Sequence, residues 1–423
     1  MIIASRVAFQ SRFALVVCAA AIGAAPGLAQ QDEEWGGSGP YLRVVDVDDS
    51  KMHLDMAVRL FTPAAGEGPT IALAGAMHIA DAEFYAVLQR FLDSQDLVLF
   101  EGVKPRGVGA IETDDDAVRV RRTESAIRFV AIMLHRQREL SGQWPVTLDE
   151  LATAIESRER QHGQWLRSSL NDAWGRPLVY ERGAEGYALR SLGADGAAGG
   201  TGFAADLAFA DQSPLTAAET GADPGLQSQL AKALGLAFQL DAMSHDRPNH
   251  RNSDLTIDQV QERVAQRGGD ASALFQILDG SSLAGRVVRF LVGMIERSPQ
   301  MRAATKLMLI ETMRLTDIEN LGRTPGLPAG MAELMHVIVI DRNKVVIEDL
   351  KGVLAGEESP RSIAIVYGAG HMGDLERRMV AECGYRHVGG FWITAMSVDL
   401  AESGMSKAEV DSMRRMLERM QPR

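Results

Sequence analysis

The chain has 423 residues, of which 46% are hydrophobic and 24% are charged, and its formal net charge is −12. This length exceeds that of one small domain and predicts two folded units, while the composition is that of an ordinary globular protein. Because the balance is acidic and no long basic run is present, nucleic acid is not an expected partner.

The first residues are typical of a signal peptide. Arginines precede the apolar run FALVVCAAAIGAA, and the small residues Gly27 and Ala29 stand just before Gln30. The pattern predicts removal of residues 1–29 and export to the periplasm or the cell exterior. A polar stretch, QQDEEW, follows at once, so no spanning helix is expected in the mature chain. Cys383 would then be the only cysteine, which excludes an intramolecular disulfide.

Next in the chain comes a strand–helix–strand pattern. The alternating segment KMHLDMAVRLF predicts a half-buried strand, and TIALAG predicts a buried one. Residues 81–93 predict a helix with one apolar face, and DLVLFEG predicts another buried strand. Since strand–helix–strand units build parallel sheets, this part predicts an α/β fold with a sheet core covered by helices.

Residues 119–212 have a different character. A helix at 124–140 is followed by short segments rich in glycine, which predict short strands and turns. We interpret this stretch as a small inserted α+β domain with its ends close together. The expected layout is a signal peptide at 1–29, a first core part at 40–118, the insert at 119–212 and a second core part at 225–400.

The second core part begins with a long middle, residues 226–354, that is predicted to be mostly helical. Thr256 and Gln259 form a capping box at the start of one of these helices. The strand–helix–strand order then returns, with a strand at 363–367, a helix at 373–382 and a strand at 391–398.

A Gly-x-x-His motif follows one strand in each core part. His78 comes after TIALAG and His371 after IAIVYG, while Glu101 stands at the end of LVLFEG. Glycines at 75, 368 and 370 are expected to let the backbone turn sharply there. Ligands of open α/β sheets bind at the carboxyl ends of the strands, so neighbouring strands would bring these three side chains together. Two imidazoles and a carboxylate can bind a divalent transition metal and a water molecule; without a metal, Glu101 and His78 could form an acid/base pair.

These motifs, in this order, resemble the TraB/PrgY/GumN family, which includes the Tiki proteases and is more distantly similar to the erythromycin esterases. The matching residues are Gly75, His78, Glu101, Asp254, Arg342, Asn343, Gly368 and His371. The resemblance covers about residues 40–115 and 225–400. It implies a divalent-metal-dependent hydrolase, with proteolysis described for Tiki members.

Beside the metal ligands His78, Glu101 and His371, the resemblance suggests roles for two more residues. Arg342 would stabilise a developing oxyanion, unless it forms only a surface ion pair on an amphipathic helix. Asn343 would orient a ligand or cap a strand. His245 and His250 fall in the polar segment SHDRPNHRNSD, which we interpret as a solvated loop rather than part of the site.

The insert resembles the C-terminal domain of type II secretion major pseudopilins, through WGRPLVY and SLGADGAAGG in matching order. The long apolar N-terminal helix of that family is missing, so assembly into a pseudopilus is not expected. The resemblance implies calcium in the glycine-rich loop, bound by the Leu192 carbonyl, Asp195 and Asp206. Usually acidic positions are here Thr201 and Ala204 or Ala205, so a loop closed by its own hydrogen bonds is the alternative.

Three functions follow as expectations. The first is an exported, divalent-metal-dependent hydrolase, with a peptidase as one form, acting on a peptide or small-molecule substrate. The second is a non-enzymatic scaffold that binds an envelope or secretion protein through the insert. The third is binding of haem or another ligand at the same strand ends.

Overall fold

The computed structural model describes residues 39–109, 115–216, 219, 226–269, 295, 298–315, 331–356 and 360–420. The chain divides into two compact units. One includes Val103–Asp223 and Leu255–Glu262, and the other includes Ser11–Gly102, Pro224–Asp254 and Arg263–Arg423. The predicted signal peptide lies outside the described residues. Within the described parts of the chain, no helix is both long and apolar enough to cross a membrane.

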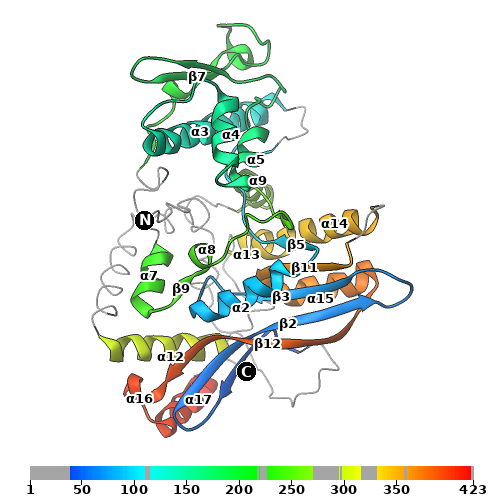
Figure 1. Cartoon of the computed structure of the whole chain (residues 1–423), viewed down its shortest axis with the longest axis vertical. Coiled ribbons are helices and arrows are strands. Elements are labelled where there is room, and N and C mark those ends of the chain that lie inside the picture. The colour runs from blue at the N-terminus through cyan, green and yellow to red at the C-terminus, as the bar shows by residue number, and fades with distance from the viewer. Residues whose placement is uncertain are drawn as a thin grey trace. The chain divides into compact units, whose positions relative to one another are not determined.

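The second unit contains a mixed seven-stranded sheet with the order β1-β2-β3-β11-β5-β10, and β12 lies beside β2. Its strands are β1 (Leu42–Asp46), β2 (Lys51–Pro63), β3 (Thr70–Ala76), β5 (Leu97–Phe100), β10 (His250–Asn252), β11 (Ser362–Gly368) and β12 (Tyr385–Asp399). The strands β3, β11, β5 and β10 are parallel to one another. The long strands β2 and β12 form an antiparallel ribbon (Figure 1).

Helices cover both faces of the parallel strands. On one face, α2 (Ala82–Asp93) buries Phe84, Tyr85 and Leu88 against small residues of β3. On the other face, α14 (Arg342–Leu354) and α15 (Ala369–Cys383) pack against Leu73 and Ile365. Successive strand residues point to opposite faces, so each strand contributes to both hydrophobic clusters. The predicted α/β fold with a sheet core is thereby confirmed.

Two expectations for the sheet are wrong. The C-terminal strand–helix–strand segment does not form a parallel pair, because β12 leaves β11 and pairs antiparallel with β2. The segment KMHLDMAVRLF alternates as predicted, but β2 is not a half-buried strand. Met56 and Val58 pack on one face, while Ala57 and Phe61 are fully buried on the other.

Further elements lie outside the large sheet and belong to the second unit, except that residues 257–262, the start of one helix, belong to the first. They are β4 (Ile79–Ala80), α7 (Leu226–Leu234), β9 (Ala237–Phe238), α8 (Gln239–Ala242), α9 (Ile257–Gln266), α12 (Pro299–Leu315), α13 (Met331–Met335), the π-helix η4 (His336–Asp341), α16 (Leu400–Ser403) and α17 (Lys407–Met420). The predicted capping box at the start of α9 is confirmed: the Thr256 N–H donates to Gln259 Oε1 at 2.9 Å, and the Gln259 N–H donates to Thr256 Oγ1 at 3.1 Å.

The first unit is a small α+β domain. Its elements are α3 (Asp116–Ser141), α4 (Leu148–Glu156), α5 (Arg160–Ser168), β6 (Val179–Arg182), β7 (Tyr187–Ser191), β8 (Leu207–Ala208) and the 3-10 turns η1 (Gly202–Ala204) and η2 (Phe209–Asp211). The three strands form one sheet in the order β6-β7-β8. Helix α3 begins earlier than predicted, because the Asp115 carboxylate accepts hydrogen bonds from the N–H groups of Ala117 and Val118.

Candidate functional site

The strand order brings three of the residues predicted from the sequence together at the carboxyl ends of neighbouring strands. Strand β11 lies between β3 and β5, and the three run in the same direction. His371 Nε2 lies 3.6 Å from Glu101 Oε1. His78 is half-buried, and the charge of Glu101 acts on its pKa, which burial lowers overall. The carboxylate of Glu101 is therefore close enough to both histidines to act on their charge.

Glu101 is held by contacts at both carboxylate oxygens. Oε1 accepts a hydrogen bond from Arg342 Nη2 at 2.8 Å, and Oε2 accepts one from the Gly368 N–H at 2.6 Å. Burial alone would raise the pKa of Glu101, but the charge of Arg342 and the Gly368 N–H hold it well below its usual range. Glu101 is thus ionised at neutral pH.

Space, rather than a sharp turn, accounts for the glycine at position 368. The backbone of Gly368 has a φ of −56°, which any residue can adopt. A Cβ atom there would lie 3.3 Å from Glu101 Oε2, a crowded separation. At Gly75 a Cβ would lie 2.9 Å from the Met56 Cε. These two glycines let β3 and β11 fit closely to their neighbours.

Arg342 is the centre of a buried ion triad. Its Nε lies 2.8 Å from Asp254 Oδ1 and its Nη2 lies 2.6 Å from Asp254 Oδ2, a bidentate pair. Asp254 Oδ2 also accepts a hydrogen bond from the Gly102 N–H at 2.9 Å. Arg342 and Asp254 are 3% and 2% exposed, so the alternative of a surface ion pair for Arg342 is wrong.

A π-helix lies directly before Arg342 and Asn343, within a run of buried residues. Residues 337–343 are all buried. The wider turn of η4 (His336–Asp341) directly precedes Arg342 and Asn343, both at the start of α14. Such π-turns are frequent at functional sites.

Asn343 fixes the tautomer of His371. Its Nδ2 donates to the His371 carbonyl and to Asp374 Oδ2, each at 3.1 Å, so its Oδ1 is left as an acceptor. That oxygen lies 2.7 Å from His371 Nδ1, which must therefore carry the proton. The lone pair of Nε2 then faces Glu101. Burial lowers the pKa of His371 to about 4, despite the opposing effect of Glu101, so the ring is neutral at pH 7.

The fit of this arrangement to a metal ion can be assessed from its contacts. Among the described residues, no group of three or more His, Cys, Asp or Glu side chains is placed to hold a metal ion. Both oxygens of Glu101 already accept hydrogen bonds, one of them from the cationic Arg342. As they lie, His78, Glu101 and His371 do not fit a three-ligand centre unless Arg342 moves. The arrangement fits acid/base chemistry better.

Tyr367 and Gln239 complete the network and were not predicted from the sequence. The Tyr367 hydroxyl donates to the Ser253 carbonyl, and its ring lies 5.1 Å from that of His371. The Gln239 side chain forms a hydrogen bond with His78. Tyr367 directly precedes the second Gly-x-x-His motif, which is the signal that could have identified it.

His245 and His250 were expected in a solvated loop, and for His250 this is wrong. His250 is the first residue of β10, which pairs with β5, and its side chain is buried. His245 is half-buried, and its ring stacks on Phe100 with 4.2 Å between the centroids.

In the first unit, the residues that were predicted to bind calcium take part in hydrogen bonds within the glycine-rich loop. Asp195 Oδ1 accepts from the Ala197 N–H at 3.0 Å, and Asp206 Oδ1 accepts from the Gly199 N–H at 3.0 Å. Arg176 donates to the carbonyls of Gly193 and Ala194 at 2.9 and 2.8 Å, next to Leu192. These contacts favour the alternative of a self-closed loop.

Comparison with known proteins identifies one segment of the chain. Residues 111–209 match the family described as Type II secretion system (T2SS), protein G. The match covers less than a quarter of the chain and falls within the first, α+β unit. Neither the curated proteins nor the solved structures contain a match to the chain. The chain thus carries a segment similar to T2SS protein G.

Proposed function

We propose that the chain is an exported hydrolase that acts on a peptide or small-molecule substrate through the His371–Glu101–Arg342 network. The observation that carries this proposal is the orientation of His371. Its Nδ1–H is bound to Asn343 at 2.7 Å, so the Nε2 lone pair is available beside an ionised carboxylate. A positioned, neutral imidazole of this kind is a general base.

In the proposed reaction, His371 Nε2 accepts a proton from the water that attacks the substrate carbonyl. Glu101, 3.6 Å away, stabilises the imidazolium that results. Arg342 supplies the positive charge for the oxyanion, although two carboxylates already share that charge. His371 then returns the proton to the leaving group, as a base that becomes an acid.

The metal-dependent form of this hydrolysis stays a prediction from the TraB/PrgY/GumN resemblance. His78, Glu101 and His371 would hold the metal, which would polarise the carbonyl or activate water. Metal binding would require Glu101 to give up its hydrogen bond with Arg342 in favour of the metal. The acid/base form requires no such change. We therefore favour the acid/base form.

The segment similar to T2SS protein G supports an association with the cell envelope. We infer that the first unit binds a protein of a secretion apparatus or envelope surface, and that the chain works in the periplasm or outside the cell. If the second unit has no activity, binding through this segment would be the whole function, as a scaffold.

The test uses the mature chain from Gln30, with peptide and ester libraries as substrates. We expect His371→Gln to lower kcat/KM by about 10²–10⁴-fold, the usual contribution of a general base. His53→Gln, in β2, is the matched control and should be unchanged. Loss of activity with a chelator would favour the metal-dependent form. Full activity in His371→Gln, or no hydrolysis of any substrate, would overturn the proposal.

A further inference from the structure

Two histidines outside the Glu101 network face each other through the same ring nitrogen. His245 Nδ1 lies 3.3 Å from His250 Nδ1. The side chain of His250 is buried on β10. The ring of His245 is parallel to that of Phe100, with 9° between the planes. Packing therefore holds both rings, and their facing nitrogens, in a fixed relation.

The separation of the two nitrogens is that of two ligands on one metal ion. Zinc binds imidazole nitrogens at about 2.0–2.1 Å, and the tetrahedral angle then places two of them about 3.3–3.4 Å apart. A long hydrogen bond between the rings would give a similar distance, so a second observation is needed to choose between the two.

That second observation concerns Nε2, the other ring nitrogen of His250. Nε2 is buried and has no hydrogen-bond partner within the described part of the chain, and Asp93 Oδ1 lies 3.8 Å from it. A metal-bound imidazole almost always directs its second N–H at a carboxylate or carbonyl. The tautomer of His250 that binds a metal through Nδ1 has its proton on Nε2, the nitrogen that lies on the side of Asp93.

The protonation state of His250 also suits a ligand. Burial lowers the pKa of His250 to about 4, against the opposing charge of Asp93, so the ring is neutral at pH 7. Metal ligands must be deprotonated, and imidazole suits zinc, copper and nickel. His245, the other proposed ligand, is half-buried.

We propose that His245 and His250 bind a divalent transition metal through their Nδ1 atoms, with water in the remaining positions and Asp93 orienting His250. The site shares no residue with the Glu101 network and does not depend on the proposed hydrolase. With two protein ligands, it takes up metal reversibly and at lower affinity than a four-ligand structural site.

The experiment titrates Co²⁺ and Zn²⁺ into the full mature chain, stripped of metal and without a histidine tag. Calorimetry and the visible absorption of Co²⁺ measure the stoichiometry and affinity. We expect one equivalent to bind to the wild type, and His245→Gln to abolish that binding. Asp93→Asn should weaken it by roughly 10–100-fold, as expected for a group that orients a ligand. His53→Gln is the matched control.

His245→Gln is the decisive variant, because replacement of the buried His250 can unfold the chain. Wild-type protein that binds no metal would overturn the proposal, and so would unchanged binding in His245→Gln. His371→Gln separates this site from the predicted centre at His78, Glu101 and His371. If His371→Gln loses the metal while His245→Gln retains it, the proposal for the histidine pair is wrong.

Discussion

Arg342 joins two carboxylates from distant parts of the chain: its Nη2 lies 2.6 Å from Asp254 Oδ2 and 2.8 Å from Glu101 Oε1. One guanidinium balances only one of the two negative charges. Each carboxylate also accepts a hydrogen bond from a backbone N–H, Asp254 from Gly102 at 2.9 Å and Glu101 from Gly368 at 2.6 Å. The network is complete only while Arg342 is in place.

Replacement of Arg342 should therefore destabilise the fold. Arg342→Met leaves two buried carboxylates without their counter-ion, and we expect a loss of about 3–5 kcal/mol in the free energy of unfolding. Arg342→Lys keeps the charge but not the bidentate geometry. Its free energy of unfolding should therefore lie between those of the wild type and Arg342→Met. Urea unfolding measures both. Arg361→Met is the control, because that side chain is 92% exposed and its ion pair with Asp96 should matter little.

Asn343 should control the tautomer of His371. Asn343→Ala removes the acceptor for Nδ1–H, so the proton is expected to distribute over both ring nitrogens. The ¹⁵N chemical shifts of the His371 ring, in labelled protein, measure that distribution. Activity should fall with the loss of the tautomer. Ring shifts identical to those of the wild type would contradict the role of Asn343.

Stability should depend on pH through His371. Its pKa is about 4 in the folded chain and about 6.5 when unfolded, so the unfolded state binds more protons between these values. Stability is then complete above about pH 6.5 and is lost as the pH falls toward 4, by up to about 3 kcal/mol for this one group. His371→Gln should flatten the dependence measured by urea unfolding at each pH. An equally steep dependence would show that other groups cause it.

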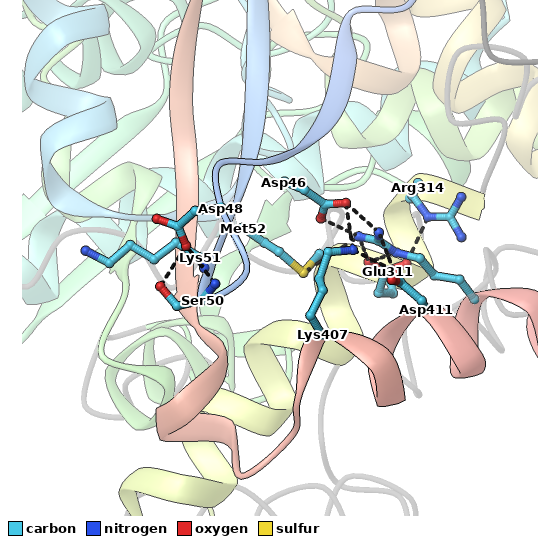
Figure 2. Close-up of polar contacts among 10 residues, drawn as sticks. Asp46, Asp48, Ser50, Lys51, Met52, Glu311, Arg314, Lys407 and Asp411 are labelled. Atoms are coloured by element: carbon cyan, nitrogen blue, oxygen red, sulfur yellow. Dashed lines mark hydrogen bonds and ion pairs between the residues drawn. The ribbon is translucent and has the colours of Figure 1, made fainter.

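Arg414 should fasten the C-terminal helix α17 to the rest of the second unit. It donates to both Asp46 oxygens at 2.8 and 3.0 Å and to Glu311 Oε1 at 2.6 Å. Lys407 lies beside Asp46 as well, at 3.0 Å, and beside Asp411 at 2.5 Å (Figure 2). Because Glu311 is only 1% exposed, the contact is weakly screened by salt.

We expect Arg414→Met to lower the free energy of unfolding by about 1–3 kcal/mol, since one partner is a buried carboxylate that loses a charged donor. Arg415→Met, at the exposed neighbouring position, should have little effect. Hydrogen exchange should show earlier opening of α17 in Arg414→Met alone. Equal exchange in the two variants would contradict the fastening role.

Arg176 should close the glycine-rich loop of the first unit in the place where calcium was predicted. Arg176→Ala removes two hydrogen bonds to carbonyls, and we expect a loss of about 2 kcal/mol. Added calcium should leave the melting temperature of the wild type unchanged. Scanning calorimetry with calcium or a chelator measures this, and Arg182→Ala is an exposed control. Stabilisation by calcium would instead favour the predicted site at Leu192, Asp195 and Asp206.

Local patterns in the sequence were enough to predict the main helices and strands and the α/β fold class. The period of two in β2, the capping box at Thr256 and the apolar face of α2 depend on near neighbours in the chain. Such signals need no knowledge of the fold. The motif order also singled out His78, Glu101 and His371 before any distance was known.

Only the tertiary structure decided how those residues meet. The sequence could not show that β11 lies between β3 and β5, or that β12 turns back to pair with β2, because strand order depends on packing between distant segments. It also could not show that three consecutive polar residues, Asp341, Arg342 and Asn343, are buried where a π-helix ends. The charge of Arg342 was visible in the sequence, but its two partners were not, since side chains so far apart in the chain are paired by the fold alone.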